Sequence, residues 1–147
     1  MNSIFDPSSN ATIITRINKL TPESQAVWGE MNVAQMCKHT NEALIVAFGE
    51  NDVKVNFVFR FLGRMMKNKV FNSEFKKNSP TAKEFIFTDK YDFETSRNEL
   101  IKNFSRFAEG HQSIKIVKHP FWGKMNYEDW NKLMWNHVDH HLLQFGV

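Results

Sequence analysis

The spacing of apolar residues along the chain predicts a protein built mainly from amphipathic helices. In several segments apolar side chains recur every three or four positions, which places them on one face of a helix. Capping residues and glycines near the segment ends support these boundaries. We expect helices over about 8–20, 32–49, 53–67 and from Asp92 or Thr95 to about 110, and a final helix that follows the cap residue Asn126.

Two segments break the helical pattern. Residues 68–91 contain an Asn-Ser-Pro sequence and no sustained period, so we expect a long, partly irregular crossover of the kind that often carries function. Residues 111–125 combine a short apolar run with the aromatic, turn-like sequence of residues 119–123. Four or five helices with little strand signal predict an all-α fold, an antiparallel helical bundle, and the cores of such bundles are common places for metal sites.

Length and composition describe one ordinary globular domain. The 147 residues are enough for a single core, and 41% are apolar and 24% charged, so we expect one domain over residues 1–147. A single cysteine, Cys37, cannot form an internal disulfide, and residues 1–10 lack a signal-peptide pattern, which favours the cytoplasm. No stretch approaches the roughly 18 apolar residues of a membrane span, and we expect no membrane partner.

The middle third of the chain is cationic, although the formal net charge of the whole chain is only +3. This concentration of positive charge could serve a partner, or it could be a solvated helix end and loop. It lacks regularly spaced base-reading or stacking groups, so we expect no nucleic-acid partner. The cations are Arg60, Arg64, Lys67, Lys69, Lys76, Lys77 and Lys83.

Three of the six histidines lie close to the C-terminus, in the last predicted helix. His137 and His141 are four positions apart, so a helix projects both rings from nearly the same side, one turn apart. That side is otherwise apolar, and we therefore expect both rings to face the interior. His39 lies on the apolar face of the second predicted helix, which would bring a third imidazole to the core.

Three imidazoles from two helices could hold one divalent metal ion. The fourth position would be water, and such an open site can acidify water or bind a substrate, unlike a structural site closed by four protein ligands. In the alternative interpretation each histidine is an ordinary hydrogen-bonded core residue. A shared ion, however, satisfies three buried imidazoles with fewer groups than separate hydrogen bonds would. Zinc, nickel, iron(II) and cobalt all accept such ligands, and we expect zinc or nickel first.

Other polar and aromatic residues are candidates for orienting the imidazoles or for binding a cofactor or substrate. Each of them could equally be a structural residue at the edge of the core. The candidates are Gln35 and Glu42 on the face of His39, Gln144 after His141, and His119 and Trp122 in the aromatic turn that could cover the site.

Two further residues near the predicted ligands are not expected to bind the metal. His140 projects to the side of His137 opposite His141, so we expect it to flank the site. Cys37 points away from His39 on the same helix and is expected to be a small buried thiol. The chain also has no glycine-rich phosphate loop, no Gly-x-Ser-x-Gly sequence and no His-Glu-x-x-His sequence, so those enzyme classes are set aside.

The histidine pattern has a wider sequence context. A tryptophan precedes the first histidine, and a glutamine follows the last histidine by three positions: Trp28, His39, His137, His141 and Gln144. This pattern resembles the DinB/YfiT-like superfamily of bacterial four-helix-bundle metalloenzymes. The sequences at 28–36, 119–123 and 137–146 are more closely similar to a subgroup catalogued only as a domain of unknown function, and the resemblance spans nearly the whole chain.

The resemblance implies that His39, His137 and His141 are the metal ligands. It also implies an up-down-down-up four-helix bundle with a long connection between the second and third bundle helices, and a homodimer. Characterised relatives include thiol-cofactor-dependent transferases and isomerases, whereas no activity is implied for the subgroup itself.

Two functional hypotheses follow for this chain. In the first it is a metal-dependent enzyme with an open tri-histidine site, a thiol-dependent transferase or a hydrolase acting on a small molecule. A low-molecular-weight thiol is then the expected cofactor. In the second it is a non-catalytic binding or dimer-forming bundle with a vestigial site.

Overall fold

The computed structural model describes residues 2–147, which form five α-helices and one short hairpin. The prediction of a mainly helical chain is confirmed. None of the helices in this described part combines the length and the apolar character needed to cross a membrane. The elements are α1 (Pro7–Ile17), α2 (Val33–Ile45), α3 (Phe57–Phe71), α4 (Phe93–Ser105) and α5 (Tyr127–Gln144), with strands β1 (Lys118–His119) and β2 (Gly123–Lys124) and 3-10 turns at Lys83–Phe85, Arg106–Glu109 and His111–Ser113.

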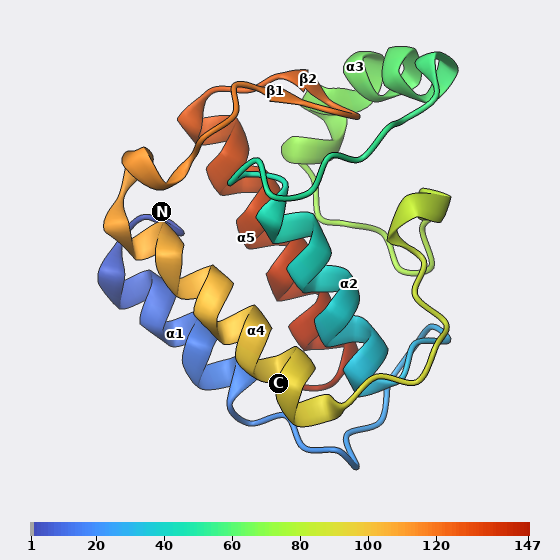
Figure 1. The fold of residues 1–147 in the computed structure, drawn as a ribbon, viewed down its shortest axis with the longest axis vertical. Helices are drawn as coiled ribbons and strands as arrows, with labels where there is room; N and C mark the ends of the chain where they lie inside the picture. The colour runs from blue at the N-terminus through green and yellow to red at the C-terminus, as the bar shows by residue number, and fades with distance from the viewer. Residues whose placement is uncertain (1) are drawn as a thin grey trace.

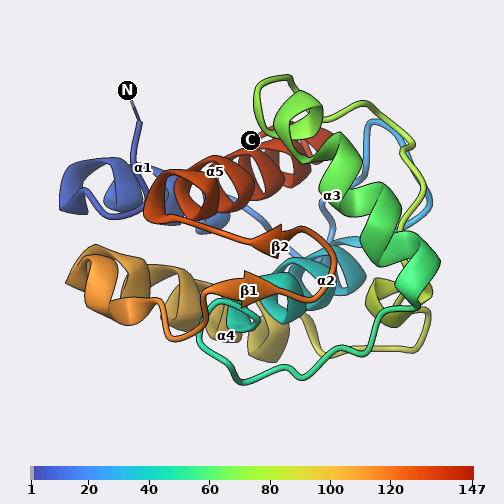
Figure 2. The ribbon, with the colours of Figure 1, turned by 90° about the horizontal axis from the view of Figure 1, so that it is seen from above.

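Four of the helices pack around a shared core. α1 lies beside α5 in one layer and α4 lies beside α2 in the other, as Figures 1 and 2 show from two directions. α2 contacts both α4 and α5, and α1 contacts the same two helices, so each of the four buries its apolar face against two neighbours. Among the largest fully buried side chains are Ile13, Met36, Leu100, Phe104 and Trp130.

The two helices that carry the predicted ligands both begin with a capping box. The Asn32 side chain accepts a hydrogen bond from the N–H of Gln35, whose own side chain accepts one from the N–H of Asn32. Asn126 and Asp129 make the same reciprocal pair at the start of α5. Such caps satisfy backbone donors that a helix leaves free at its N-terminus, and they fix where the helix starts. The predicted caps Asn32 and Asn126 are confirmed.

α3 lies outside the two layers and contacts α5 and the hairpin (Figure 2). It approaches the β1–β2 hairpin at Gly63, where an added Cβ would clash with the carbonyl oxygen of Phe121. Only glycine allows the two backbones to come so close. The ammonium group of Lys67 ties α3 to α5 by donating to the carboxylate of Asp129 at 2.6 Å. The hairpin and this ion pair therefore hold α3 against the rest of the protein.

Several element boundaries differ from those predicted. α3 begins at Phe57 rather than near residue 53, because the Asn56 side chain accepts from the N–H of Val58 and caps the helix there. α1 ends at Ile17, three residues early, although Leu20 beyond it is still buried. The segment predicted as one helix to residue 110 is α4 followed by a 3-10 turn. Apolar spacing continues across such turns, so it overestimates the length of the helix.

Candidate metal centre

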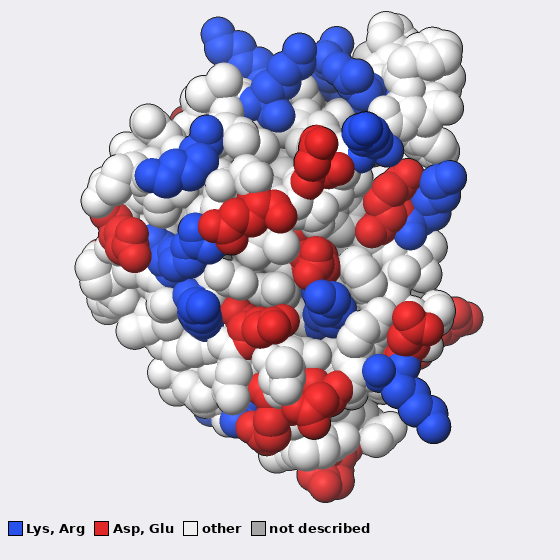
Figure 3. All heavy atoms as spheres, viewed as in Figure 1, with Lys and Arg blue, Asp and Glu red and all other residues white. Residues whose placement is uncertain are grey.

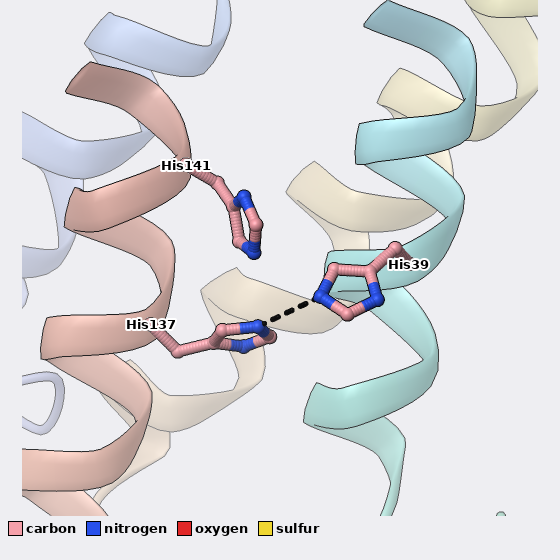
Figure 4. A group of neighbouring side chains, drawn as sticks. All are labelled: His39, His137 and His141. Atoms are coloured by element: carbon pink, nitrogen blue, oxygen red, sulfur yellow. Dashed lines mark hydrogen bonds between the residues drawn. The ribbon is translucent and has the colours of Figure 1, made fainter. Parts of the chain in front are cut away.

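The three predicted ligands meet between α2 and α5 (Figure 4). The ring centroids of His39 and His137 are 5.1 Å apart, and each lies 4.8 Å from the centroid of His141. One ring nitrogen from each residue lies within 4.8 Å of the other two. His39 and His141 are buried, and His137 is partly buried. The structure thus brings together three imidazoles from two helices, and they could hold a metal ion.

Hydrogen bonds determine which nitrogen carries the proton in two of these rings. His39 donates from Nδ1 to the carbonyl oxygen of Phe85 at 2.8 Å, because a carbonyl can only accept. Gln144 donates from Nε2 to the carbonyl oxygen of Trp28 at 2.8 Å. This bond directs the Oε1 of Gln144 to accept from Nδ1 of His141, also at 2.8 Å. In both rings Nε2 therefore carries a lone pair and no proton, and Nε2 of His39 accepts a hydrogen bond from Nε2 of His137. Figure 4 shows these atoms on the sides of the rings that face one another.

The third ring completes a geometry that suits a metal ion. Nε2 of His137 lies 3.0 Å from Nε2 of His39. Two nitrogens that bind one tetrahedral zinc ion at about 2.05 Å lie about 3.3 Å from each other, close to this separation. Neutral imidazole nitrogen is also a donor that suits zinc, nickel and similar divalent ions. The residues present therefore fit a divalent transition metal, and the identity of that metal remains a prediction.

The protein environment keeps the three imidazoles neutral. Burial lowers the pKa of His39, and burial together with the neighbouring histidines lowers the pKa of His137 well below its ordinary value. Burial, with a smaller effect from His39, lowers the pKa of His141 to about 3. A metal ion binds the neutral form of imidazole, so at neutral pH these rings carry no positive charge that would oppose its binding.

The same burial predicts that the metal-free protein is sensitive to acid. Burial lowers the pKa of both His119 and His141 to about 3, against about 6.5 in an unfolded chain. Their neutral forms stabilise the fold above pH 6.5, and each loses up to about 1.4 kcal/mol of that contribution per pH unit as the pH falls from 6.5 toward 3. We expect the melting temperature of the metal-free protein to decrease steadily over that range.

Thermal unfolding followed by circular dichroism checks this expectation. His119→Asn is the matched variant, because an amide oxygen can accept the backbone hydrogen bonds that Nδ1 of His119 accepts from Phe121 and Trp122, and it does not titrate. We expect a shallower decrease for this variant. If the melting temperatures of the variant and of the unmodified protein decrease equally with pH between 6.5 and 4, the proposed contribution of His119 to the acid sensitivity is contradicted.

Gln144 is the flanking candidate that directly contacts a predicted ligand. It joins Nδ1 of His141 to the carbonyl oxygen of Trp28, and it is itself buried. A hydrogen bond of this kind sets the tautomer and the orientation of an imidazole ligand. Gln144 therefore positions His141 rather than facing the centre of the cluster.

Removing this positioning contact tests its importance. We expect Gln144→Leu to weaken zinc binding about 10- to 100-fold, because the ring of His141 loses the partner that fixes its proton on Nδ1. Competition titration with a chromophoric zinc chelator measures the change. Gln25→Leu, at an exposed position outside the site, is the matched control and should bind zinc as the unmodified protein does. Unchanged affinity in Gln144→Leu would refute the positioning role.

The other two candidates on α2 use their polar atoms elsewhere. Gln35 belongs to the capping box of α2 and also donates to the carbonyl oxygen of Asp89. Glu42 forms an ion pair with Lys38 at 2.7 Å and accepts from Asn51, and it lines a groove between α2 and α4. A role for Gln35 or Glu42 in binding a cofactor stays a prediction.

His119 and Trp122 lie in the hairpin. Nδ1 of His119 accepts from the N–H groups of Phe121 and Trp122 and so closes the turn, while its ring packs against Trp130. The ring of Trp122 packs edge-on against Phe71 of α3, with centroids 5.2 Å apart. These contacts join the hairpin to α3 and α5. Participation of either residue in cofactor binding stays a prediction.

A rim of four residues borders the cluster: Trp28, Phe75, Lys77 and His140. The Phe75 ring lies 6.2 Å from the ring of His137 and 6.0 Å from that of His140. The ammonium group of Lys77 sits 4.3 Å from the centre of the Trp28 ring, in a cation–π contact. Trp28 in turn packs edge-on against His140, 5.7 Å away. The predicted crossover thus runs along the cluster, and it brings a positive charge to the rim.

Sequence reasoning did not identify most of these surroundings. The flanking position of His140 was expected and is confirmed, since its ring lies 5.3 Å from that of His141. The roles of Phe75 and Lys77 and of the Phe85 carbonyl were not predicted. The only sequence feature that indicated a role for this segment was the length and irregularity of the crossover. Helical periodicity cannot place side chains of an irregular segment, and a backbone carbonyl leaves no trace in the sequence.

Cys37 is separate from this chemistry. Its side chain is fully buried, and burial raises the pKa of the thiol to about 12. A thiol with such a pKa stays protonated at neutral pH and is a poor nucleophile and a poor metal ligand. The prediction of a small buried thiol is confirmed.

These observations define a class: a mainly helical protein whose packed helices hold three inward-facing histidines able to share a metal ion. The chain belongs to the family described as "Protein of unknown function (DUF1569)", whose model matches residues 5–146. No curated protein and no solved structure matches the chain. The matched residues include all five helices and all three histidines of the cluster.

Proposed function

We propose that this protein is a metal-dependent enzyme with an open tri-histidine site. The observation that carries the proposal is the convergence of three neutral imidazoles, two of which have Nε2 lone pairs fixed by hydrogen bonds from Nδ1. Among residues 2–147, the group that could hold a metal consists of these three histidines and has no fourth protein ligand. Structural zinc sites use four protein ligands, whereas sites with three leave a position for water or substrate.

We further propose that the fold is of the DinB/YfiT-like type. In this proposal α1, α2, α4 and α5 are the four helices of an up-down-down-up bundle. The long connection between α2 and α4 includes α3 and the rim residues Phe75 and Lys77. The mutual contacts of the four helices and the placement of His39 on α2 and His137 on α5 support this assignment.

The proposed reaction is a transfer or a hydrolysis on a small molecule. A bound divalent ion would supply Lewis acidity, which lowers the pKa of a coordinated water or thiol and so produces a nucleophile near neutral pH. The chain's own residues prepare the site for this. Burial keeps the imidazoles neutral, Gln144 and the Phe85 carbonyl hold two of them in one tautomer, and Phe75 places an apolar ring beside His137.

The rim favours a negatively charged substrate or cofactor. Lys77 is held over the ring of Trp28, and Trp28 packs against His140, which adjoins His141 in the cluster. Low-molecular-weight thiols such as glutathione and bacillithiol carry carboxylates as well as a sulfur that a zinc or nickel ion accepts. We therefore propose such a thiol as the cofactor and a cytoplasmic homodimer as the working form, with no nucleic-acid partner.

Ligand-induced stabilisation tests the thiol part of the proposal. We expect glutathione or bacillithiol to raise the melting temperature of the zinc- or nickel-loaded protein, because a ligand that binds only the folded state stabilises it. The S-methyl derivative of the same thiol should have a smaller effect, since its sulfur cannot become a thiolate. Lys77→Gln should raise the concentration needed for half of the shift, whereas Lys19→Gln, at an exposed position on α1's C-terminal side, should not.

The second candidate function is a non-catalytic bundle with a vestigial site. Elemental analysis of the purified protein separates the two. Less than about a tenth of an equivalent of any transition metal, even after reloading with zinc and nickel, would favour the vestigial site. About one equivalent with three imidazole ligands would favour the enzyme.

A further inference from the structure

α3 exposes an unusual amount of apolar surface. Phe57 is 77% exposed, Met65 is 68% exposed and Phe61 is 61% exposed, although phenylalanine and methionine usually lie in the core. Only Gly63 and Phe71 of this helix are buried. Contiguous apolar surface of this kind commonly marks an interaction site. The outward side chains include Phe57, Phe59, Phe61, Leu62, Met65 and Met66.

The apolar residues occupy the side of α3 that faces away from the protein. At about 100° per residue, Phe57, Phe61 and Met65 fall within about 80° of one another. Gly63, which faces the hairpin, lies on the opposite side of the helix, about 160° from Phe61 and Met65. α3 therefore presents a convex apolar ridge to its surroundings, unlike the other four helices, which turn their apolar faces inward.

The charge on α3 and on the adjoining hairpin is mainly positive, and the nearest acidic residues along the chain, Asp52 and Glu74, lie beyond the two ends of the helix. Residues 53–73 contain five lysines and arginines and no aspartate or glutamate. The adjoining segment 115–126, which includes the hairpin, adds three lysines and again no acidic residue. Lys67 is neutralised by Asp129 of α5, which leaves the other cations of the two segments available. In Figure 3 one group of Lys and Arg side chains lies at the end of the molecule that carries the hairpin and α3, beside white surface. The Asp and Glu side chains of that face lie lower, where they are interspersed with other Lys and Arg side chains.

We infer that α3 docks this protein on the surface of a bilayer that contains anionic phospholipids. A helix that lies in a membrane interface needs an apolar face to enter the headgroup boundary and flanking cations to contact the phosphates, and α3 offers both. Its convex form suits insertion into lipid, whereas a protein partner would need a groove to receive it. A second copy of the chain would bring two ridges of the same positive charge together. The bilayer is therefore the occupant that the charges favour.

This inference revises the expectation that the protein has no membrane partner. That expectation depended on the absence of an apolar run long enough to span a bilayer. A helix that lies along the surface does not need such length, because only one of its faces contacts lipid. The inference does not depend on the proposed metal chemistry.

Vesicle co-sedimentation of the full chain tests the inference. The probes are vesicles of phosphatidylcholine alone and vesicles of equal parts phosphatidylcholine and phosphatidylglycerol. We expect binding to the anionic vesicles only, and weaker binding at 0.5 M salt because salt screens the attraction. Phe61→Ser with Met65→Ser should lower binding at least about tenfold, since two apolar side chains no longer enter the lipid. Lys69→Glu should lower it at least about fivefold.

Matched variants and a second measurement make the outcome decisive. Val27→Ser also removes an exposed apolar side chain, but outside α3, and should leave vesicle binding unchanged. Far-ultraviolet circular dichroism verifies that each variant is folded. Absence of binding to anionic vesicles, or equal binding to neutral ones, would overturn the inference. So would sedimentation-velocity data in which Phe61→Ser with Met65→Ser converts a dimer to a monomer without vesicle binding, because the ridge would then be a contact between copies of the chain.

Discussion

Replacing both His137 and His141 with alanine is expected to reduce the zinc bound by the reloaded protein from about one equivalent per chain to less than about a tenth. The two rings supply two of the three nitrogens in the cluster, and His39 alone cannot retain an ion against water. Inductively coupled plasma mass spectrometry of the dialysed protein measures the content. Full retention of zinc by this double variant would refute the metal centre.

A control must show that this loss is not a consequence of unfolding. The helical circular dichroism signal of the double variant should persist, because the apolar contacts of α5, such as those of Trp130 and Leu142, are untouched. His111→Ala removes an exposed imidazole outside the cluster and should keep its zinc. Loss of zinc in this control as well would indicate that surface histidines bind the ion.

The largest expected effect on stability comes from the core rather than from the site. Phe104→Ala should lower the free energy of unfolding by about 3 to 5 kcal/mol, because the side chain is fully buried and its removal leaves a cavity. For a chain of this length such a loss corresponds to a decrease of roughly 10 °C in melting temperature. Denaturant titration followed by circular dichroism measures the change.

Phe57→Ala is the matched control for this substitution. It makes the same chemical change on the outward ridge of α3, where the side chain is 77% exposed, and should alter the free energy of unfolding by less than about 0.5 kcal/mol. Phe104→Ala should also keep its zinc stoichiometry, because α4 contributes no ligand to the cluster. Equal destabilisation by the two variants would contradict the packing described for α3 and α4.

The sequence allowed the helices and the three histidines to be predicted because both depend on local spacing. The separation of four between His137 and His141 defines one helix face wherever the helix lies, and the apolar neighbours of that face show which side turns inward. The inward position of His39 could be predicted in the same way. The distance between α2 and α5 could not, because it depends on the packing of side chains from all four helices.

The surroundings of the cluster depend on information that periodicity does not contain. The Phe85 and Trp28 carbonyls are main-chain groups, and any residue type could have supplied them. Lys77 reaches the rim through an irregular segment, and there the position of a side chain depends on tertiary contacts. The outward direction of the α3 ridge could not be predicted either, because the spacing of its apolar residues is equally compatible with a face that packs against the core.

X-ray absorption spectroscopy at the zinc edge of the zinc-loaded protein tests the metal centre most directly. We predict three nitrogen neighbours at about 2.0 to 2.1 Å, with the outer-shell scattering of imidazole rings, and one further light atom from water. His137→Ala should remove one imidazole from that shell. A spectrum with fewer than three imidazoles in the unmodified protein, or with a sulfur neighbour at about 2.3 Å, would contradict a centre formed by His39, His137 and His141.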